Sequence, residues 1–192
     1  MSYGVQRILA AVLLVLLFPL LLLIAAGCAV FSGFPVLFQG VRIGQNKKRF
    51  VIYKFRTMKE NASPLTEEQE WEFARSGKLR DDPRVTFFGR FLRRFSLDEL
   101  PQLWNVVRND MALIGPRPIV DFEETIYGKY STLIHSVKPG ITGLWQVSGR
   151  NLTTYHRRIA INCYYVRHRC WKLDLWIVCR TFGAVLGGRG AF

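Results

Sequence analysis

The chain has 192 residues, with 27 Lys and Arg against 14 Asp and Glu, so its formal net charge is +13, and 49% of its residues are hydrophobic. This length excludes two large domains and suffices for one core, with or without a membrane segment. The hydrophobic content excludes a disordered basic tail, and the charge indicates a polyanionic partner such as nucleic acid, anionic lipid or a phosphorylated substrate. The four cysteines form no CxxC pair, so neither a zinc site nor a redox motif is indicated.

An uncharged apolar run of 24 residues extends from Ile8 to Phe31. As a helix it would be about 36 Å long, against a hydrocarbon core of roughly 30 Å. It is therefore long enough to cross a bilayer and too long for the apolar part of a cleavable signal peptide. Pro19 lies inside the run and is expected to kink or break the helix. The residues alone leave two topologies open: a kinked span, which they favour, and a re-entrant helix that returns to the same face.

A basic cluster follows the apolar run at Arg42, Lys47, Lys48 and Arg49. In either topology this cluster places the following chain on the cytoplasmic side. A competing interpretation is that residues 25–28 form a lipoprotein cleavage site, which would put the remainder outside the cytoplasm. The only positive charge before that site is Arg7, whereas a signal peptide begins with a basic region.

The first element expected beyond the apolar run is a strand. β-Branched and aromatic residues at positions 50–56 predict a short strand or β-hairpin. Strand alternation places Lys54 and Arg56 on the same face. Residues 66–73 then predict a short capped acidic helix in a surface excursion, to which we assign no chemistry.

Two further segments combine aromatic residues with arginines. Residues 85–95 would form a helix with a phenylalanine stripe beside a guanidinium stripe, and residues 164–186 repeat the mixture with tryptophans. Both predict amphipathic helices in a membrane interface. The alternative for the first is a core-packed helix with solvated arginines. With the hairpin, these segments predict a mostly helical α+β fold.

Two adjacent carboxylates, Asp98 and Glu99, follow the first amphipathic segment. Because Pro101 is best tolerated at the start of a helix, the next helix is expected near Leu100, with both acids on the approach to its N-terminus. There, free N–H groups and nearby arginines would keep Asp98 ionised, able to act as a nucleophile or a metal ligand. The alternative is structural, since Ser96 and Glu99 have the spacing of a capping box.

Two turn-rich segments follow. Residues 115–118 hold Arg117 between two prolines, an arrangement suited to binding a phosphate or, alternatively, a stiff turn with a solvated arginine. Residues 139–143 offer backbone N–H groups that could cradle an anion, but they lack the spacing of a Walker loop. His156 and His168 have no evident partner and are expected to be structural or solvated.

Taken together, these residues resemble the monotopic polyprenyl-phosphate phosphoglycosyl transferases, a family of bacterial sugar transferases. The resemblance rests on the apolar segment with its proline and on ordered motifs along nearly the whole chain, at residues 53–58, 96–102, 109–118, 139–143 and 164–166. It implies transfer of a sugar 1-phosphate from a UDP-sugar to undecaprenyl or a similar polyprenyl phosphate, with Mg²⁺ and release of UMP. The place implied is the cytoplasmic face of the bacterial inner membrane.

The resemblance also implies roles for individual side chains. Asp98 would be the nucleophile that attacks the β-phosphate to give a phosphosugar–aspartyl intermediate, and Glu99 would assist it, both carboxylates being metal ligands. The cationic candidates for binding phosphate or substrate are Lys54, Arg56, Arg93 and Arg117.

The N-terminal helix of this family is re-entrant, so the resemblance favours a re-entrant helix over residues 1–35, bent at Pro19, before a cytoplasmic domain over residues 36–192. A serine often precedes the membrane proline in the family, whereas this chain has Phe18. The expected partners are a UDP-sugar, a polyprenyl phosphate and the phospholipid bilayer, with no nucleic acid. The alternative function is a non-catalytic basic adaptor at the membrane surface. Residues 188–192 resemble the end of transferases for galactose or glucose 1-phosphate, without fixing the sugar.

Overall fold

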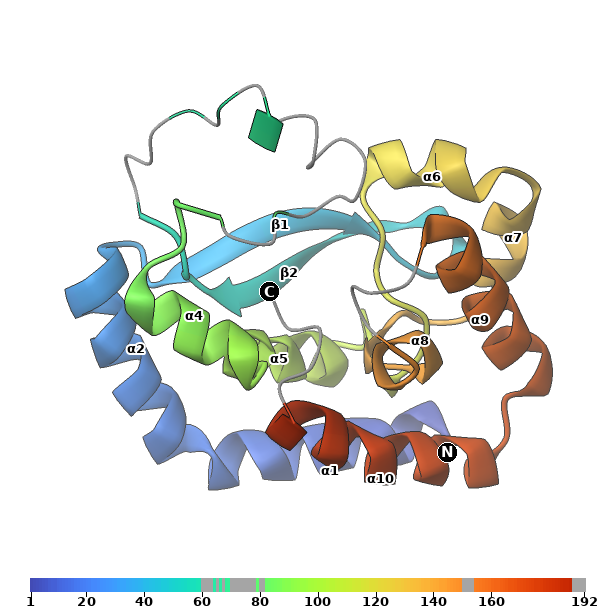
Figure 1. The fold of residues 1–192 in the computed structure, drawn as a ribbon. Coiled ribbons are helices and arrows are strands. Elements are labelled where there is room, and N and C mark those ends of the chain that lie inside the picture. The colour runs from blue at the N-terminus through green and yellow to red at the C-terminus, as the bar shows by residue number, and fades with distance from the viewer. Residues whose placement is uncertain are drawn as a thin grey trace.

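The computed structural model describes residues 1–59, 82–149 and 154–187, together with positions 64, 66, 68, 69 and 79. This part of the chain is mostly helical and contains two small sheets, so the predicted α+β class is confirmed (Figure 1). The helices are α1 (Tyr3–Leu16), α2 (Phe18–Ser32), α4 (Phe87–Arg94), α5 (Gln102–Val107), α6 (Asp121–Tyr127), α7 (Ser131–Ile134), α8 (Leu144–Val147), α9 (Tyr155–His168) and α10 (Trp171–Gly187). The strands are β1 (Leu37–Ile43), β2 (Arg49–Phe55), β3 (Ala112–Ile114) and β4 (Gly140–Thr142), and the 3₁₀ turns are η1 (Gln45–Lys47), η2 (Leu97–Glu99) and η3 (Gly128–Tyr130).

The N-terminal apolar run forms two helices, α1 and α2, that meet at a bend of 65° (Figure 1). Within the described residues no single helix has the length and apolar composition to cross a membrane, and this bent pair alone meets that test when taken together. The break lies at Leu17, and Pro19 occupies the first turn of α2. Because the first N–H groups of a helix have no partner within it, Pro19 removes no hydrogen bond there. The predicted bend near Pro19 is confirmed.

Helix α2 packs against α4 through a cluster of side chains that includes Ile24, Cys28 and Leu92. Gly27 lies directly under the ring of Phe88, where an added Cβ would come within 2.5 Å of the ring. Phe31 stacks on the same ring, with the two centroids 5.4 Å apart. Cys28 is fully buried in this contact, which does not favour the lipid-modified cysteine of the lipoprotein interpretation.

Helix α1 packs against α5 and β3 and shares a core cluster with β2 through Ala10 and Ile52. The buried Gln6 provides a hydrogen-bond acceptor to β3. Its side-chain oxygen accepts hydrogen bonds from the N–H groups of Leu113 (2.8 Å) and Ile114 (3.2 Å). A buried amide in an apolar helix is stable where such bonds are made. Gln6 therefore ties the first helix to the strand that leads into Arg117.

The predicted hairpin is confirmed, since β1 and β2 pair antiparallel from Leu37 opposite Phe55 to Ile43 opposite Arg49. The expectation that residues 139–143 form a loop with free N–H groups is wrong. Most of that segment is β4, which pairs parallel with β3, and the Gly140 N–H donates to the carbonyl of Pro116. Tertiary pairing has overridden the local turn signal of its proline and glycines.

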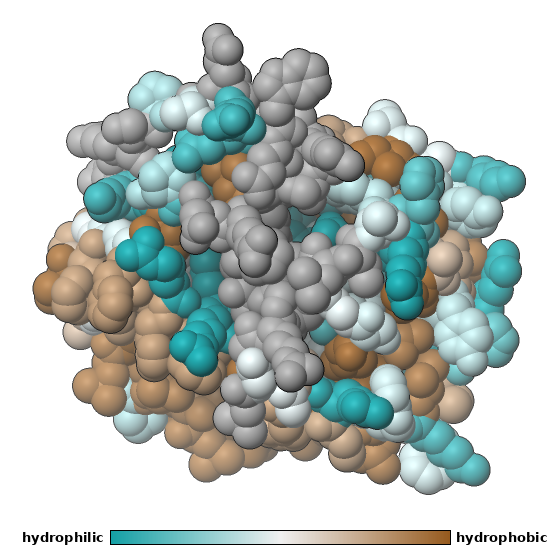
Figure 2. Space-filling model, viewed as in Figure 1, coloured by the Kyte–Doolittle hydropathy of each residue, from teal (hydrophilic) through white to brown (hydrophobic). Residues whose placement is uncertain are grey.

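Both predicted amphipathic segments contain helices. Residues 87–94 form α4, capped by Thr86, whose side chain accepts a hydrogen bond from the Gly89 N–H at 2.9 Å. Residues 164–186 cover the end of α9 and nearly all of α10. Large side chains on these helices are exposed, among them Phe87, Phe91, Trp171, Trp176 and Phe182. Figure 2 shows a continuous hydrophobic surface over α2 and along the edge formed by α1.

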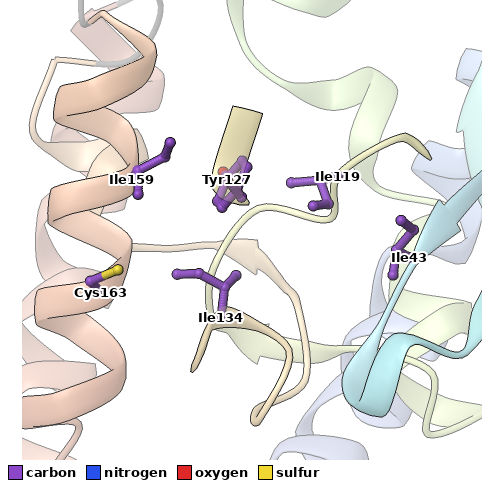
Figure 3. Close-up of a cluster of buried hydrophobic side chains, with 6 residues drawn as sticks. All are labelled: Ile43, Ile119, Tyr127, Ile134, Ile159 and Cys163. Carbon is purple, nitrogen blue, oxygen red and sulfur yellow. The ribbon is translucent and has the colours of Figure 1, made fainter. Parts of the chain in front are cut away.

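A second core lies on the other side of the molecule, between α9, α6, α7 and β1 (Figure 3). It is formed by Ile43, Ile119, Tyr127, Ile134, Ile159 and Cys163.

Of the acidic helix expected at residues 66–73, the structure describes only Thr66, Glu68 and Gln69, and residues 188–192 lie outside the described residues.

His135 is buried where α7 meets the β1–β2 turn, a position that no sequence motif indicates. Its Nδ1 lies 3.0 Å from the carbonyl oxygen of Gly44, and its Nε2 is buried without a hydrogen-bond partner. Burial lowers the pKa of His135 below its ordinary value of 6.5, with the Gly44 bond opposing the shift.

We expect the protein to lose stability as the pH falls below about 6.5, because the unfolded chain then takes up a proton that folded His135 resists. Thermal unfolding at pH 7.5 and pH 5.5 measures the loss, and His135→Gln should reduce this pH dependence. An equal pH dependence in both proteins would contradict the assignment.

Candidate active site

The two carboxylates lie in the turn η2, between α4 and α5. Ser96 begins this turn in the left-handed conformation, with φ 54° and ψ 24°, and its side chain makes no capping hydrogen bond. The capping-box alternative is therefore wrong. Helix α5 begins at Gln102, close to the predicted start, so both acids lie outside regular helix. Asp98 is only 8% exposed, and Glu99 is half-buried.

Lys54, near the end of β2, reaches this turn from the hairpin. Its Nζ lies 2.5 Å from Oε1 of Glu99, and both side chains are partly buried. A charge-assisted bond of this kind is stronger than a neutral one and fixes both groups. The pair therefore connects the strand to the turn that carries Asp98.

Arg93 lies in the last turn of α4, and its carbonyl accepts a hydrogen bond from the Ser96 N–H at 3.1 Å, where the same turn begins. Its Nε donates to Oγ1 of Thr57 at 3.0 Å. Burial lowers the pKa of Arg93, while the negative charges of Asp98 and Asp82 oppose that shift. An arginine keeps its charge throughout the physiological range, so a partly buried cation lies in the helix that precedes Asp98.

Arg56 follows the end of β2. One of its terminal nitrogens donates to the carbonyl of Phe34 at 3.0 Å, and Arg56 lines a surface hollow of about 530 Å³ together with residues 34–39. The structure thus brings Lys54 and Arg93 to the Asp98 turn and shows Arg56 in contact with the segment that joins α2 to β1.

Arg117 follows β3 and lies against the ring of Trp145, with 5.8 Å from its guanidinium carbon to the ring centroid. Arg158 of α9 contacts the same ring at 5.1 Å and the ring of Tyr155 at 5.0 Å. Burial and then the charge of Arg117 lower the pKa of Arg42 in β1, while the charges of Glu123 and Glu99 raise it. We call Arg117, Arg158 and Trp145 the tryptophan cluster. Of these residues, sequence reasoning identified only Arg117 as a site residue.

Asn105 is a second residue that sequence reasoning missed. It is fully buried in α5, and its side chain bonds to the outer edge of β2. Its Oδ1 accepts from the Tyr53 N–H at 3.2 Å, and its Nδ2 donates to the Val51 carbonyl at 2.7 Å. These bonds fix the position of β2, and so of Lys54, relative to the helix that follows the carboxylates.

The metal-ligating capacity of the site rests on its two carboxylates. Among the residues that the structure describes, no three His, Cys, Asp or Glu side chains gather as a preformed metal site. Magnesium, however, is commonly held by one or two carboxylates and completes its shell with water and substrate phosphates. Asp98 and Glu99 therefore fit a magnesium ion that binds together with a phosphorylated substrate.

Comparison with known proteins shows the family to which this chain belongs. The sequence pattern of the bacterial sugar transferase family matches residues 2–188. The exopolysaccharide production protein ExoY of Rhizobium meliloti (strain 1021) is 43% identical, over 95% of this chain and 84% of its own length. The UDP-glucose:undecaprenyl-phosphate glucose-1-phosphate transferase of Xanthomonas campestris pv. campestris is 39% identical over 97% of this chain and 39% of its own length. The undecaprenyl-phosphate galactose phosphotransferase of Salmonella typhimurium is 42% identical over 84% of this chain and 35% of its own length.

Proposed function

The chain belongs to the bacterial sugar transferase family and is a phosphoglycosyl transferase, and on that premise we propose that it transfers a sugar 1-phosphate from a UDP-sugar to undecaprenyl phosphate. UMP leaves, and the product is the first lipid-linked intermediate of a membrane glycan. The observation that carries the proposal is the buried Asp98, held in a turn beside the Lys54–Glu99 pair and Arg93. Membership of the family favours an enzyme over the non-catalytic adaptor.

The proposed reaction has two steps at one carboxylate. An oxygen of Asp98 attacks the β-phosphorus of the UDP-sugar, the bond between that phosphorus and the bridging oxygen breaks, and UMP leaves with the electron pair. An oxygen of undecaprenyl phosphate then attacks the same phosphorus, which breaks the aspartyl bond and restores the Asp98 carboxylate. Burial of Asp98 supports this role, because a largely buried carboxylate has little water around it to displace.

The cations near Asp98 counter the repulsion between anionic substrates and an anionic nucleophile. Arg93 would stabilise charge that develops on the transferred phosphate, since a partly buried cation acts more strongly than one surrounded by water. Lys54 already binds Glu99, so it would orient that carboxylate and share its charge with an arriving phosphate. Arg117, held between two prolines, would offer a further cationic contact for a phosphate of the donor.

Magnesium would be held by Asp98 and Glu99 together with phosphate oxygens of the donor. Bound there, it would supply charge neutralisation to the phosphoryl oxygens. The adjacent position of the two carboxylates and the lack of a larger acidic cluster among the described residues support a substrate-borne ion.

We further propose that α1 and α2 enter the cytoplasmic leaflet of the inner membrane as a re-entrant pair, with the remaining chain on the cytoplasmic side. The 65° bend and the exposed apolar side chains of both helices support this arrangement. The exposed aromatic residues of α4 and α10 would then lie at the interface, where aromatic rings concentrate. This placement brings a soluble donor and a membrane-bound acceptor to one site.

The test is release of UMP by the purified protein in lipid nanodiscs with Mg²⁺, undecaprenyl phosphate and a panel of UDP-sugars. We expect UMP with at least one donor and a matching sugar–diphosphate lipid product. No UMP and no lipid product with any donor in the panel, from protein shown to be folded, would contradict the proposal.

A further inference from the structure

Thr57 follows β2 and is buried against the start of α4, with 7% of its surface exposed. Its carbonyl oxygen accepts a hydrogen bond from the Thr86 N–H at 3.0 Å and a longer one from the Thr86 hydroxyl at 3.4 Å. Met58 and Val85 form an antiparallel β-bridge beside these bonds. These contacts fix the backbone of Thr57 relative to α4, and the side chain of a β-branched residue has few rotamers.

The Thr57 hydroxyl binds the guanidinium group of Arg93. Nε of Arg93 donates a hydrogen bond to Oγ1 of Thr57 at 3.0 Å, from the last turn of α4. This bond does not use the two terminal nitrogens of the guanidinium group, which form the edge that binds an anion through two hydrogen bonds. Thr57 therefore restrains the group at Nε, away from the edge suited to a phosphate.

The stretch of backbone that carries Thr57 also carries Lys54, and the two side chains bind partners on either side of Asp98 in the sequence. Lys54 binds Glu99, the residue after Asp98, at 2.5 Å. Thr57 binds Arg93, which lies in the helix that leads into the Asp98 turn. One short stretch of the chain thus holds two charged side chains that border the turn of the proposed nucleophile.

A pair of buried hydroxyl groups fixes the other end of α4. Oγ of Ser32, the last residue of α2, lies 3.2 Å from Oγ1 of Thr86, the residue that caps α4. Both side chains are buried, and α2 packs against α4 (Figure 1). The start of α4 is therefore held by α2 and by Thr57, and the hydroxyl of Thr57 restrains Arg93 at the end of the same helix.

We propose that Thr57 is a positioning residue for the transfer reaction, whose hydroxyl holds the Arg93 guanidinium group in the orientation that meets the transferred phosphate. The inference rests on the proposed function, in which Arg93 stabilises charge that develops on that phosphate. Arginine has a long, flexible side chain, and a misplacement of about 1 Å at a reaction centre can lower the rate by about 10²-fold. Thr57 supplies no chemistry of its own and acts through Arg93.

The test compares Thr57→Val with Thr57→Ser in UMP release by the full chain in nanodiscs. Valine keeps the shape of threonine without the hydroxyl, whereas serine keeps the hydroxyl. We expect Thr57→Val to lower kcat by about tenfold or more and to leave the KM for the UDP-sugar within about twofold, because the restrained group acts in the transition state. Thr57→Ser should keep most of the kcat that Thr57→Val loses. The matched control is Thr125→Val at an exposed position of α6, where the hydroxyl donates to the Phe122 carbonyl at 2.8 Å, and its kcat should stay within about twofold.

A double-mutant cycle with Arg93→Gln distinguishes positioning from a general structural role. The rate of sugar-phosphate transfer in a single turnover is measured for each single variant and for the double variant. If Thr57 acts through Arg93, Thr57→Val should change the rate of the Arg93→Gln protein by less than about twofold. An equal loss in both backgrounds, an unchanged kcat in Thr57→Val, or a Thr57→Ser protein as slow as Thr57→Val would overturn the assignment.

Thermal unfolding establishes that each variant is folded. If Thr57→Val does not fold, Thr57→Ala, which also removes the hydroxyl and needs less space, replaces it with the same expectations. Failure of the proposed function is a separate result, because it would show as absence of UMP release by the unchanged protein. Failure of the present assignment would instead leave UMP release intact in the unchanged protein.

Discussion

Replacing Asp98 by Asn should abolish UMP release while the fold is retained. The change is isosteric but removes the anionic oxygen that attacks phosphorus, and loss of a covalent nucleophile commonly lowers kcat by at least about 10³-fold. With a donor labelled in the sugar and no lipid acceptor, the unchanged protein should hold the label on its own chain. Asp98→Asn should hold none.

The matched control is Asp121→Asn in the first turn of α6. Asp121 is exposed and forms a surface ion pair with Arg49 at 3.2 Å, so its loss should change activity less than about twofold. If Asp98→Asn kept most of its turnover, or if label remained on the variant, another residue would be the nucleophile. The non-catalytic adaptor alternative predicts that both variants behave alike.

Local patterns in the sequence predicted those parts of the fold that depend on neighbouring residues. β-Branched and aromatic residues predicted the strand that carries Lys54, and Pro101 predicted a helix start just after Asp98 and Glu99. The bend near Pro19 was equally predictable, because the proline ring restricts the backbone of the residues before it whatever surrounds it.

The remaining parts depend on contacts across the chain. The partners of Arg158 and Asn105 come from other elements, so no spacing along the sequence marks either residue. The prediction of a loop at residues 139–143 is wrong because the glycines there allow two backbone segments to pack closely, and do not form a turn. A Cβ on Gly140 would come within 2.1 Å of the backbone nitrogen of Gly115, the residue that follows the neighbouring strand β3. The partners of these residues become evident only in the folded structure.

Gly89→Ala should have the opposite effect from the same substitution in an ordinary helix. There, alanine stabilises the helix by about 1 kcal/mol relative to glycine. Gly89 lies in α4, where an added Cβ would come within 2.2 Å of the carbonyl oxygen of Thr57. That carbonyl also accepts the Thr86 N–H, and the Thr57 side chain holds Arg93, so α4 cannot move away without disturbing both contacts. We therefore expect the free energy of unfolding to fall by about 2 kcal/mol or more, together with a loss of UMP release.

The control for this prediction is Gly183→Ala in α10, a position where an added Cβ would meet no atom within 4 Å. The same substitution should there follow the intrinsic helix preference and raise the thermal unfolding midpoint. Measured side by side, the two variants should shift the midpoint in opposite directions. An increase in both would mean that α4 does not approach Thr57 this closely, and the position of Arg93 beside Asp98 would then need to be revised.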